Sequence, residues 1–177
     1  MKLESPAFTK ADFEQFQADV GDIEKQSVIN RLRAASGRML ELAARIPDEA
    51  PTEDGEWNAK EVLAHLAVVS KGWGVLAYLI AKGRMPEVEA VTLIAQRDPL
   101  ATELLPLYPV DIAREAATAQ QRTIAYLEKA PMEEFTAPVR WELGATTADH
   151  IFRTILVGHL EMHVSQLEQM LSPDNAA

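Results

Sequence analysis

The sequence predicts an all-α protein, a four-helix bundle with a long connection between the second and third helices. Apolar residues recur every three or four positions over four long stretches, the period of a helix that buries one face. Strand signals are weak, because β-branched and polar residues do not alternate in any run. The chain has 177 residues, of which 47% are hydrophobic and 25% charged, which indicates one globular domain with its own core.

The first helix is predicted from about Asp22 to Ile46, because Pro47 then stops it. Residues 1–21 are expected to form an N-terminal arm with a short helix near Lys10–Phe16, which leaves 22–177 as the bundle domain. The apolar side of this first helix comprises Ile29, Leu32, Met39, Leu40, Ala43 and Ile46.

The second helix begins after Asn58, a good N-cap, with Glu61 at the third helical position, and ends near Lys82 before Gly83. Its stripe comprises Val62, His65, Leu66, Val69, Trp73, Leu76 and Ile80. The stretch 62–81 is long enough to span a bilayer. Polar and glycine residues interrupt it, so a buried helix of a soluble bundle is the preferred interpretation.

Residues 84–109 are less regular, with a short helix expected near 87–96. The third long helix is predicted over about 110–129, and a loop over 132–145. The fourth helix is predicted from Thr146, which has capping-box spacing to Asp149, to about Leu171. The apolar side of the third helix comprises Ile112, Ala116, Ala117, Ile124 and Leu127, and the core face of the fourth comprises Phe152, Leu156, His159, His163, Gln166 and Met170.

Composition excludes several classes of function. With 17 basic and 27 acidic residues the formal charge is −10, which disfavours binding to a nucleic-acid backbone. No cysteine is present, so disulfides, thiolate zinc sites and a cysteine nucleophile are ruled out. The N-terminal sequence lacks the apolar segment of a signal peptide, so we expect a cytoplasmic protein that does not enter a membrane.

Three of the four histidines are predicted to share one site. His159 and His163 are four residues apart, so their rings project from one face, a turn apart. His65 lies on the apolar stripe of another helix, and bundle metal sites are built from facing helices in this way. A hydrogen-bonded buried group without metal is the alternative, but it leaves three imidazoles to satisfy in an apolar core. His150 is nine residues before His159 and is expected on the outer surface.

The sequence HLEMH at 159–163 differs from the zinc-protease motif HExxH, whose glutamate directly follows the first histidine. Glu161 is therefore expected to point away from the site, and a zincin-type protease is excluded. Glu61, one turn before His65, is interpreted as a capping-box residue, with a base or ligand-supporting role as the alternative. The sequence singles out no catalytic side chain.

The segments EWNAKEVLAHL, with Trp57 and His65, and GHLEMHVSQL, with Gln166 three residues after His163, resemble the DinB/YfiT-like metalloenzyme family. The resemblance covers about residues 22–171. It implies a four-helix bundle, often dimeric, in which His65, His159 and His163 bind a divalent metal in an open site. Met162 and Ser165 depart from the commoner form of the last motif, which reads HxxHH followed by Gly-Gln, without touching these ligands.

This resemblance implies a metal-dependent enzyme, either a thiol-dependent S-transferase or a hydrolase, acting on a small-molecule substrate. Zinc or nickel is the preferred ion among those that imidazole binds, and a low-molecular-weight thiol is a candidate cofactor. The alternative is a non-catalytic homodimeric bundle that holds a structural metal or a small ligand.

Overall fold

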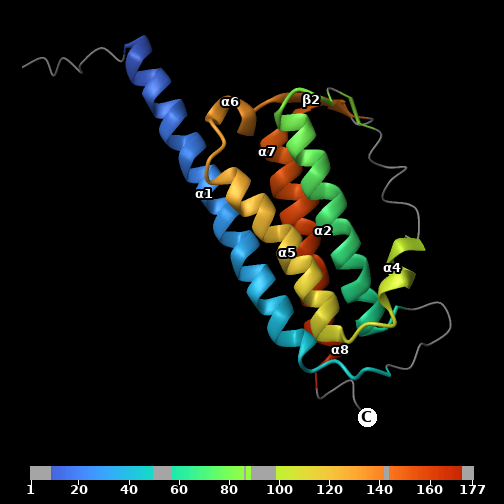
Figure 1. The fold of residues 1–177 in the computed structure, drawn as a ribbon. Helices are drawn as coiled ribbons and strands as arrows, with labels where there is room; N and C mark the ends of the chain where they lie inside the picture. The colour runs from blue at the N-terminus through green and yellow to red at the C-terminus, as the bar shows by residue number, and fades with distance from the viewer. Residues whose placement is uncertain (1–8, 50–56, 86, 89–98, 142–143, 173–177) are drawn as a thin grey trace, which may run out of the picture.

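The computed structural model describes residues 9–49, 57–85, 87–88, 99–141 and 144–172, and they are mostly helical. Long helical segments run side by side (Figure 1). They are α1 (Lys10–Ala43), α2 (Ala59–Ala81), α5 (Pro109–Leu127) and a final run made of α7 (Ala148–His150), η1 (Ile151–Gly158) and α8 (His159–Met170). Short helices α4 (Pro99–Leu104) and α6 (Met132–Phe135) lie in the connections.

Helix α1 begins at Lys10 rather than Asp22, so the predicted first helix was too short. Thr9 caps it: its side chain accepts from the backbone N of Asp12, and Asp12 accepts in return from the backbone N of Thr9. Residues 10–20 are exposed, and this end of α1 projects past the other helices (Figure 1). Phe13, Phe16 and Val20 keep the three- and four-residue spacing of an apolar face there, but they are exposed because no core element of the described structure covers them.

Helix α2 begins as predicted, with the reciprocal capping box between Asn58 and Glu61. It is the only described helix long and apolar enough to cross a membrane by length and composition, and 44% of that window is buried inside the protein. Its fully buried residues include Leu63 and Leu66, which belong to the common core. A core helix of a soluble protein passes the same test of length and composition.

The core forms where α2 packs against α5 and α1 packs against α5 and α8. The predicted apolar faces of α1 and α5 are largely those that the structure buries. A long connection joins α2 to α5, as predicted, but its secondary structure differs from the prediction. Residues 87–88 form strand β1 instead of starting a helix, and the rest of the predicted helix, 89–96, lies outside the described residues.

A small three-stranded sheet, order β1-β2-β3, lies at one end of the helices and was not predicted. Strand β1 (Glu87–Val88) pairs in parallel with β2 (Pro138–Trp141), which pairs antiparallel with β3 (Gly144–Thr147). The predicted loop 132–145 is thus α6 and part of a hairpin. Gly144 has φ +121°, which glycine adopts without steric cost.

The last helical run differs from the predicted continuous α-helix. Its N-cap is Thr147, without a side-chain capping bond, because β3 extends through Thr147 and Asp149 accepts instead from Arg153. Residues 151–158 form a π-helix, a rare form frequent at functional sites. The α-helical geometry resumes at His159, immediately where the predicted site begins.

Candidate metal centre

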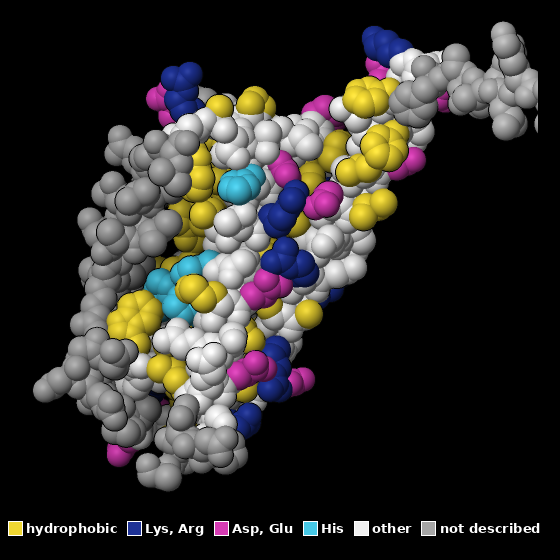
Figure 2. Space-filling view, turned by 180° about the vertical axis from the view of Figure 1, so that it is seen from behind, with side chains coloured by type: hydrophobic (Ala, Val, Ile, Leu, Met, Phe, Trp, Pro, Cys, Tyr) yellow, Lys and Arg dark blue, Asp and Glu magenta, His cyan; other side chains and the backbone are white. Residues whose placement is uncertain are grey.

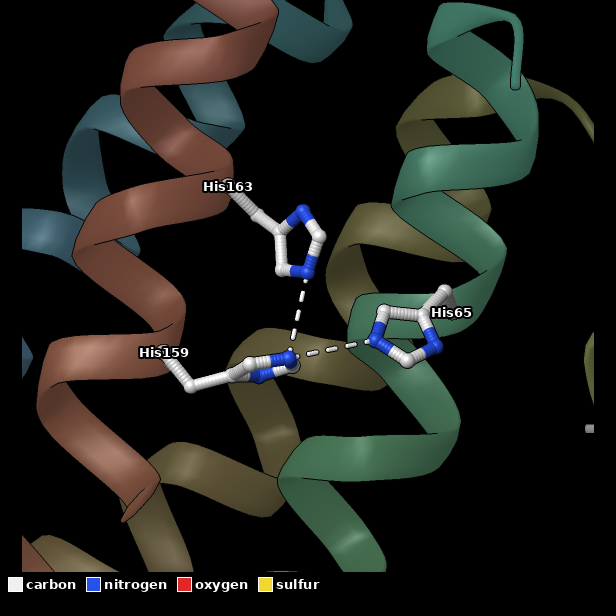
Figure 3. A group of neighbouring side chains, drawn as sticks. All are labelled: His65, His159 and His163. Carbon is white, nitrogen blue, oxygen red and sulfur yellow. Dashed lines mark hydrogen bonds between the residues drawn. The ribbon is translucent and has the colours of Figure 1, made fainter. Parts of the chain in front are cut away.

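The three predicted histidines meet between α2 and α8 (Figure 3). His65 projects from α2 towards His159 and His163, which project from α8. One ring nitrogen from each lies within 4.8 Å of those of the other two. His163 is buried, whereas His65 and His159 are half-buried. On the face seen from behind, a group of histidine side chains reaches the surface in a hollow beside hydrophobic side chains (Figure 2).

Local helix structure brings these side chains together. The one-turn separation on α8 places the Nε2 atoms of His159 and His163 3.1 Å apart, with ring centroids 4.5 Å apart. The capping box fixes where α2 begins, and His65 follows two turns later with its Nε2 3.4 Å from Nε2 of His159. The site therefore depends on how α2 and α8 are packed against each other.

Gln166 determines which nitrogen of His163 faces the other rings. Nδ1 of His163 lies 2.7 Å from Oε1 of Gln166, one turn further along α8. Since an amide oxygen only accepts, Nδ1 carries the proton and Nε2 presents a lone pair to the centre. This is the outer hydrogen bond that orients most metal-binding histidines. The motif placed Gln166 beside the site, but spacing alone did not give it this role.

The contacts among the three histidine rings cannot all be hydrogen bonds. Nε2 of His159 contacts both other Nε2 atoms, yet a neutral imidazole nitrogen carries either one proton or one lone pair. Both contacts therefore cannot be full hydrogen bonds. A single cation accepting three lone pairs would satisfy all three rings, so the donor set fits a metal ion better than an isolated hydrogen-bonded group.

The distances also fit. Two nitrogens bound to tetrahedral zinc at about 2.0–2.1 Å are about 3.3 Å apart, and about 3.0 Å apart at a right angle. Two of the three separations, 3.1 and 3.4 Å, lie close to these values, and the remaining pair of nitrogens lies within 4.8 Å, so a small rotation of the rings would suit zinc or an octahedral ion such as nickel. No carboxylate joins this group within the described part of the chain.

Burial keeps two of the rings neutral. Burial, with smaller contributions in the same direction from the neighbouring His163 and His65, lowers the pKa of His159 to about 4. Burial also lowers the pKa of His163, against the opposing effect of the hydrogen bond that its Nδ1 donates to Gln166. Because a metal binds only the deprotonated imidazole, protons compete little with a cation for these nitrogens at neutral pH.

Two cavities border the histidines from different sides. One of about 170 Å³ is lined by His65, Trp57 and Glu61 among others, and the Trp57 ring lies 4.7 Å from that of His65 between centroids. Another of about 240 Å³ is lined by His159 and Trp73. These cavities could not be predicted from the sequence, because their walls combine residues of α2, of the α4 segment and of the η1–α8 run, which are far apart in the chain.

The structure leaves the other candidates outside the cluster. Glu161 accepts from Nε of Arg31 on α1 at 2.8 Å, so it points away from the site as predicted. Glu61 forms the predicted capping box, with its carboxylate on the backbone N of Asn58. His150 lies apart from the cluster, as predicted; it is half-buried, and its ring lies 5.9 Å from that of Trp141 between centroids.

Comparison with known proteins gives one match. The family model of the DinB superfamily matches residues 31–167, which include all three histidines. No curated protein and no solved structure matches the chain.

Proposed function

The chain belongs to the DinB superfamily, and on that premise we propose that it is a metal-dependent enzyme that acts on a small-molecule substrate. The observation that carries the proposal is the convergence of three imidazole nitrogens from two helices within 4.8 Å. We assign the long helical segments to a four-helix bundle of the DinB type, with the site between α2 and α8.

His65, His159 and His163 would hold the ion. A divalent metal with three protein ligands and open positions can lower the pKa of a bound water or bind a thiolate. Gln166 would orient His163 through its Nδ1, and burial would keep His159 neutral at the pH of the cell. Both effects support a site that holds its ion without a carboxylate ligand.

The two cavities support a small substrate. At about 170 and 240 Å³ each is smaller than the roughly 300–1,000 Å³ usual for drug-sized ligands. Their positions beside His65 and beside His159 suit a reaction between two partners that approach from different sides. This favours transfer to or from a low-molecular-weight thiol, with hydrolysis as the other reaction class and zinc or nickel as the ion.

The test is metal analysis and turnover on protein purified without a histidine tag. We expect about one zinc or nickel ion per chain, and turnover in a screen of thiol-transfer and hydrolase substrates. His163→Ala should lose both, whereas His150→Ala, which lies outside the cluster, should keep both. Metal content far below one ion that soaking does not restore, or activity equal to that of His163→Ala, would contradict the proposal.

The second candidate is a non-catalytic homodimer with a structural metal. It is favoured by an apolar depression of about 340 Å³ on α2, lined by Val69, Leu76 and Met85 among others, since such patches often mark interfaces. A structural ion should lower the melting temperature strongly when chelated, whereas an open catalytic site should leave the fold intact. Light scattering tests the homodimer, and fractionation tests a cytoplasmic, membrane-free location.

A further inference from the structure

A third cavity lies between α2 and α5, on the other side of α2 from the histidines. It measures about 310 Å³ and is lined by residues of both helices, including Gly74 and Thr123. Gly74 follows His65 by nine residues, about half a turn out of phase, so this cavity is separated from the proposed metal site by the helix itself. We call it the α2–α5 cavity.

Two cations border it. Lys71 on α2 and Arg122 on α5 both line the cavity, and neither forms an ion pair or hydrogen bond within the described part of the chain. Arginines elsewhere on these helices and their neighbours are paired, as in Arg31–Glu161 and Arg114–Asp111. In a protein of net charge −10, two unpaired cations beside one cavity mark a local site for negative charge.

The rest of the lining is mainly apolar. Val75 is 56% exposed, and the Tyr78 and Tyr126 rings pack edge to face with centroids 5.0 Å apart. The hydroxyl of Tyr126 already donates to Glu134 at 2.7 Å, so its ring is held in place. This end of the cavity offers aromatic surface to an apolar group.

A polar corner lies beside the cations. Ser70 lines the cavity and is buried, and its Oγ accepts from Nε2 of Gln120 at 2.9 Å. Its own hydroxyl hydrogen has no acceptor among the described residues. Oε1 of Gln120, fully buried, also has no hydrogen-bond partner there. The cavity thus combines one hydroxyl donor, two cations and an apolar wall.

We propose that the α2–α5 cavity binds a small organic anion with an apolar body. Its carboxylate lies between Lys71 and Arg122 within reach of Ser70, and its ring or chain lies on Val75 and the two tyrosine rings. The volume of about 310 Å³ suits a molecule of one or two rings. An inorganic anion would make no contact with the apolar wall, and a neutral apolar molecule would form no ion pair with Lys71 or Arg122.

The experiment is calorimetric titration of the full chain with 2-naphthoate, beside its neutral analogue 2-naphthalenemethanol and inorganic phosphate. Each titration is run on metal-loaded and on chelated protein, because a carboxylate can also bind a metal. We expect 2-naphthoate to bind at least about tenfold more tightly than the alcohol or phosphate, equally with and without metal. Exposed ion pairs contribute modestly, so Lys71→Ala or Arg122→Ala should each weaken binding about threefold to fivefold.

Two further variants test whether binding depends on the cavity itself or on positive charge anywhere on the protein. Ala119→Leu fills part of the cavity while keeping both cations and should abolish binding. Lys129→Ala removes an exposed lysine outside the cavity and should leave the affinity unchanged. Three results would each overturn the proposal. The alcohol could bind as tightly as 2-naphthoate, or chelation could abolish 2-naphthoate binding. Finally, the affinity could remain unchanged in both Ala119→Leu and the Lys71→Ala/Arg122→Ala double variant.

Discussion

Replacing Gln166 by leucine tests whether the histidine cluster is organised to bind a metal. The side chains are similar in size, and Gln166 is half-buried, so the change mainly removes the acceptor of the 2.7 Å hydrogen bond from Nδ1 of His163. Without it, the tautomer and the ring orientation of His163 are no longer fixed. We expect a weaker metal complex with an intact fold.

The size of the effect follows from the burial of Gln166. Loss of such an outer hydrogen bond costs about 10- to 100-fold in metal affinity. Because Gln166 is half-buried, water can replace part of the lost acceptor, so the lower end is expected, about tenfold or about 1.4 kcal/mol. The Gln166 hydrogen bond raises the pKa of His163, so its loss also reduces proton competition, and the difference should shrink from pH 7.5 to pH 6.

The assay is competition with a chelating dye, using zinc and nickel in turn. Gln166→Glu keeps an acceptor on His163 and should bind at least as tightly as the unchanged protein. Gln121→Leu, the same change at an exposed position of α5, is the matched control. If Gln166→Leu and Gln121→Leu bound metal with equal affinity, the orientation of His163 would be set by helix packing alone and the reasoning would be refuted.

Three other predictions concern stability. Burial lowers the pKa of His159 to about 4 from an ordinary value of 6.5. As the pH falls below 6.5, the unfolded chain therefore takes up a proton at His159 before the folded chain does. In metal-free protein the free energy of unfolding should decrease between pH 6.5 and pH 4 for this reason. His159→Asn should flatten that part of the melting temperature–pH curve, and an unchanged slope would count against it. Asn58→Ala removes the α2 cap and should lower the free energy of urea unfolding by about 1 kcal/mol, whereas Asn58→Asp should not. Deleting residues 1–19, which precede Gly21 and are exposed where described, should change that free energy by less than about 0.5 kcal/mol; a larger loss would place the predicted arm within the bundle domain.

The long helices could be predicted because each buries a stripe against the others. On α2 the capping residues Asn58 and Glu61 and the buried residues Val62, Leu66 and Ile80 act within a few positions of one another. Such signals are local and are therefore visible in the sequence. Before Gly21, α1 leaves the core: Phe13, Phe16 and Val20 keep helical spacing but are exposed, and the predicted helix, which began at Asp22, omitted this part.

The sheet could not be predicted for a different physical reason. Strands β2 and β3 have four residues each, too few for an alternating pattern, and β1, which pairs with β2, comes from a segment far away in the sequence. Val139 is the only residue of β2 and β3 that is fully buried. The hairpin depends on the positive φ of Gly144, which a single glycine in a sequence does not reveal.

The contrast between His150 and the other histidines follows from the π-helix. The relation of His159 to His163 depends on one turn of α8 and is unaffected by what precedes it. Placing His150 opposite His159 required nine residues of uninterrupted α-helix, but residues 151–158 are wound with a longer hydrogen-bond step. The angle calculated for a continuous α-helix therefore does not apply across those residues, and His150 is half-buried beside Trp141. Spacing within one helical turn therefore predicts that His159 and His163 lie together, whereas spacing across η1 does not predict the position of His150.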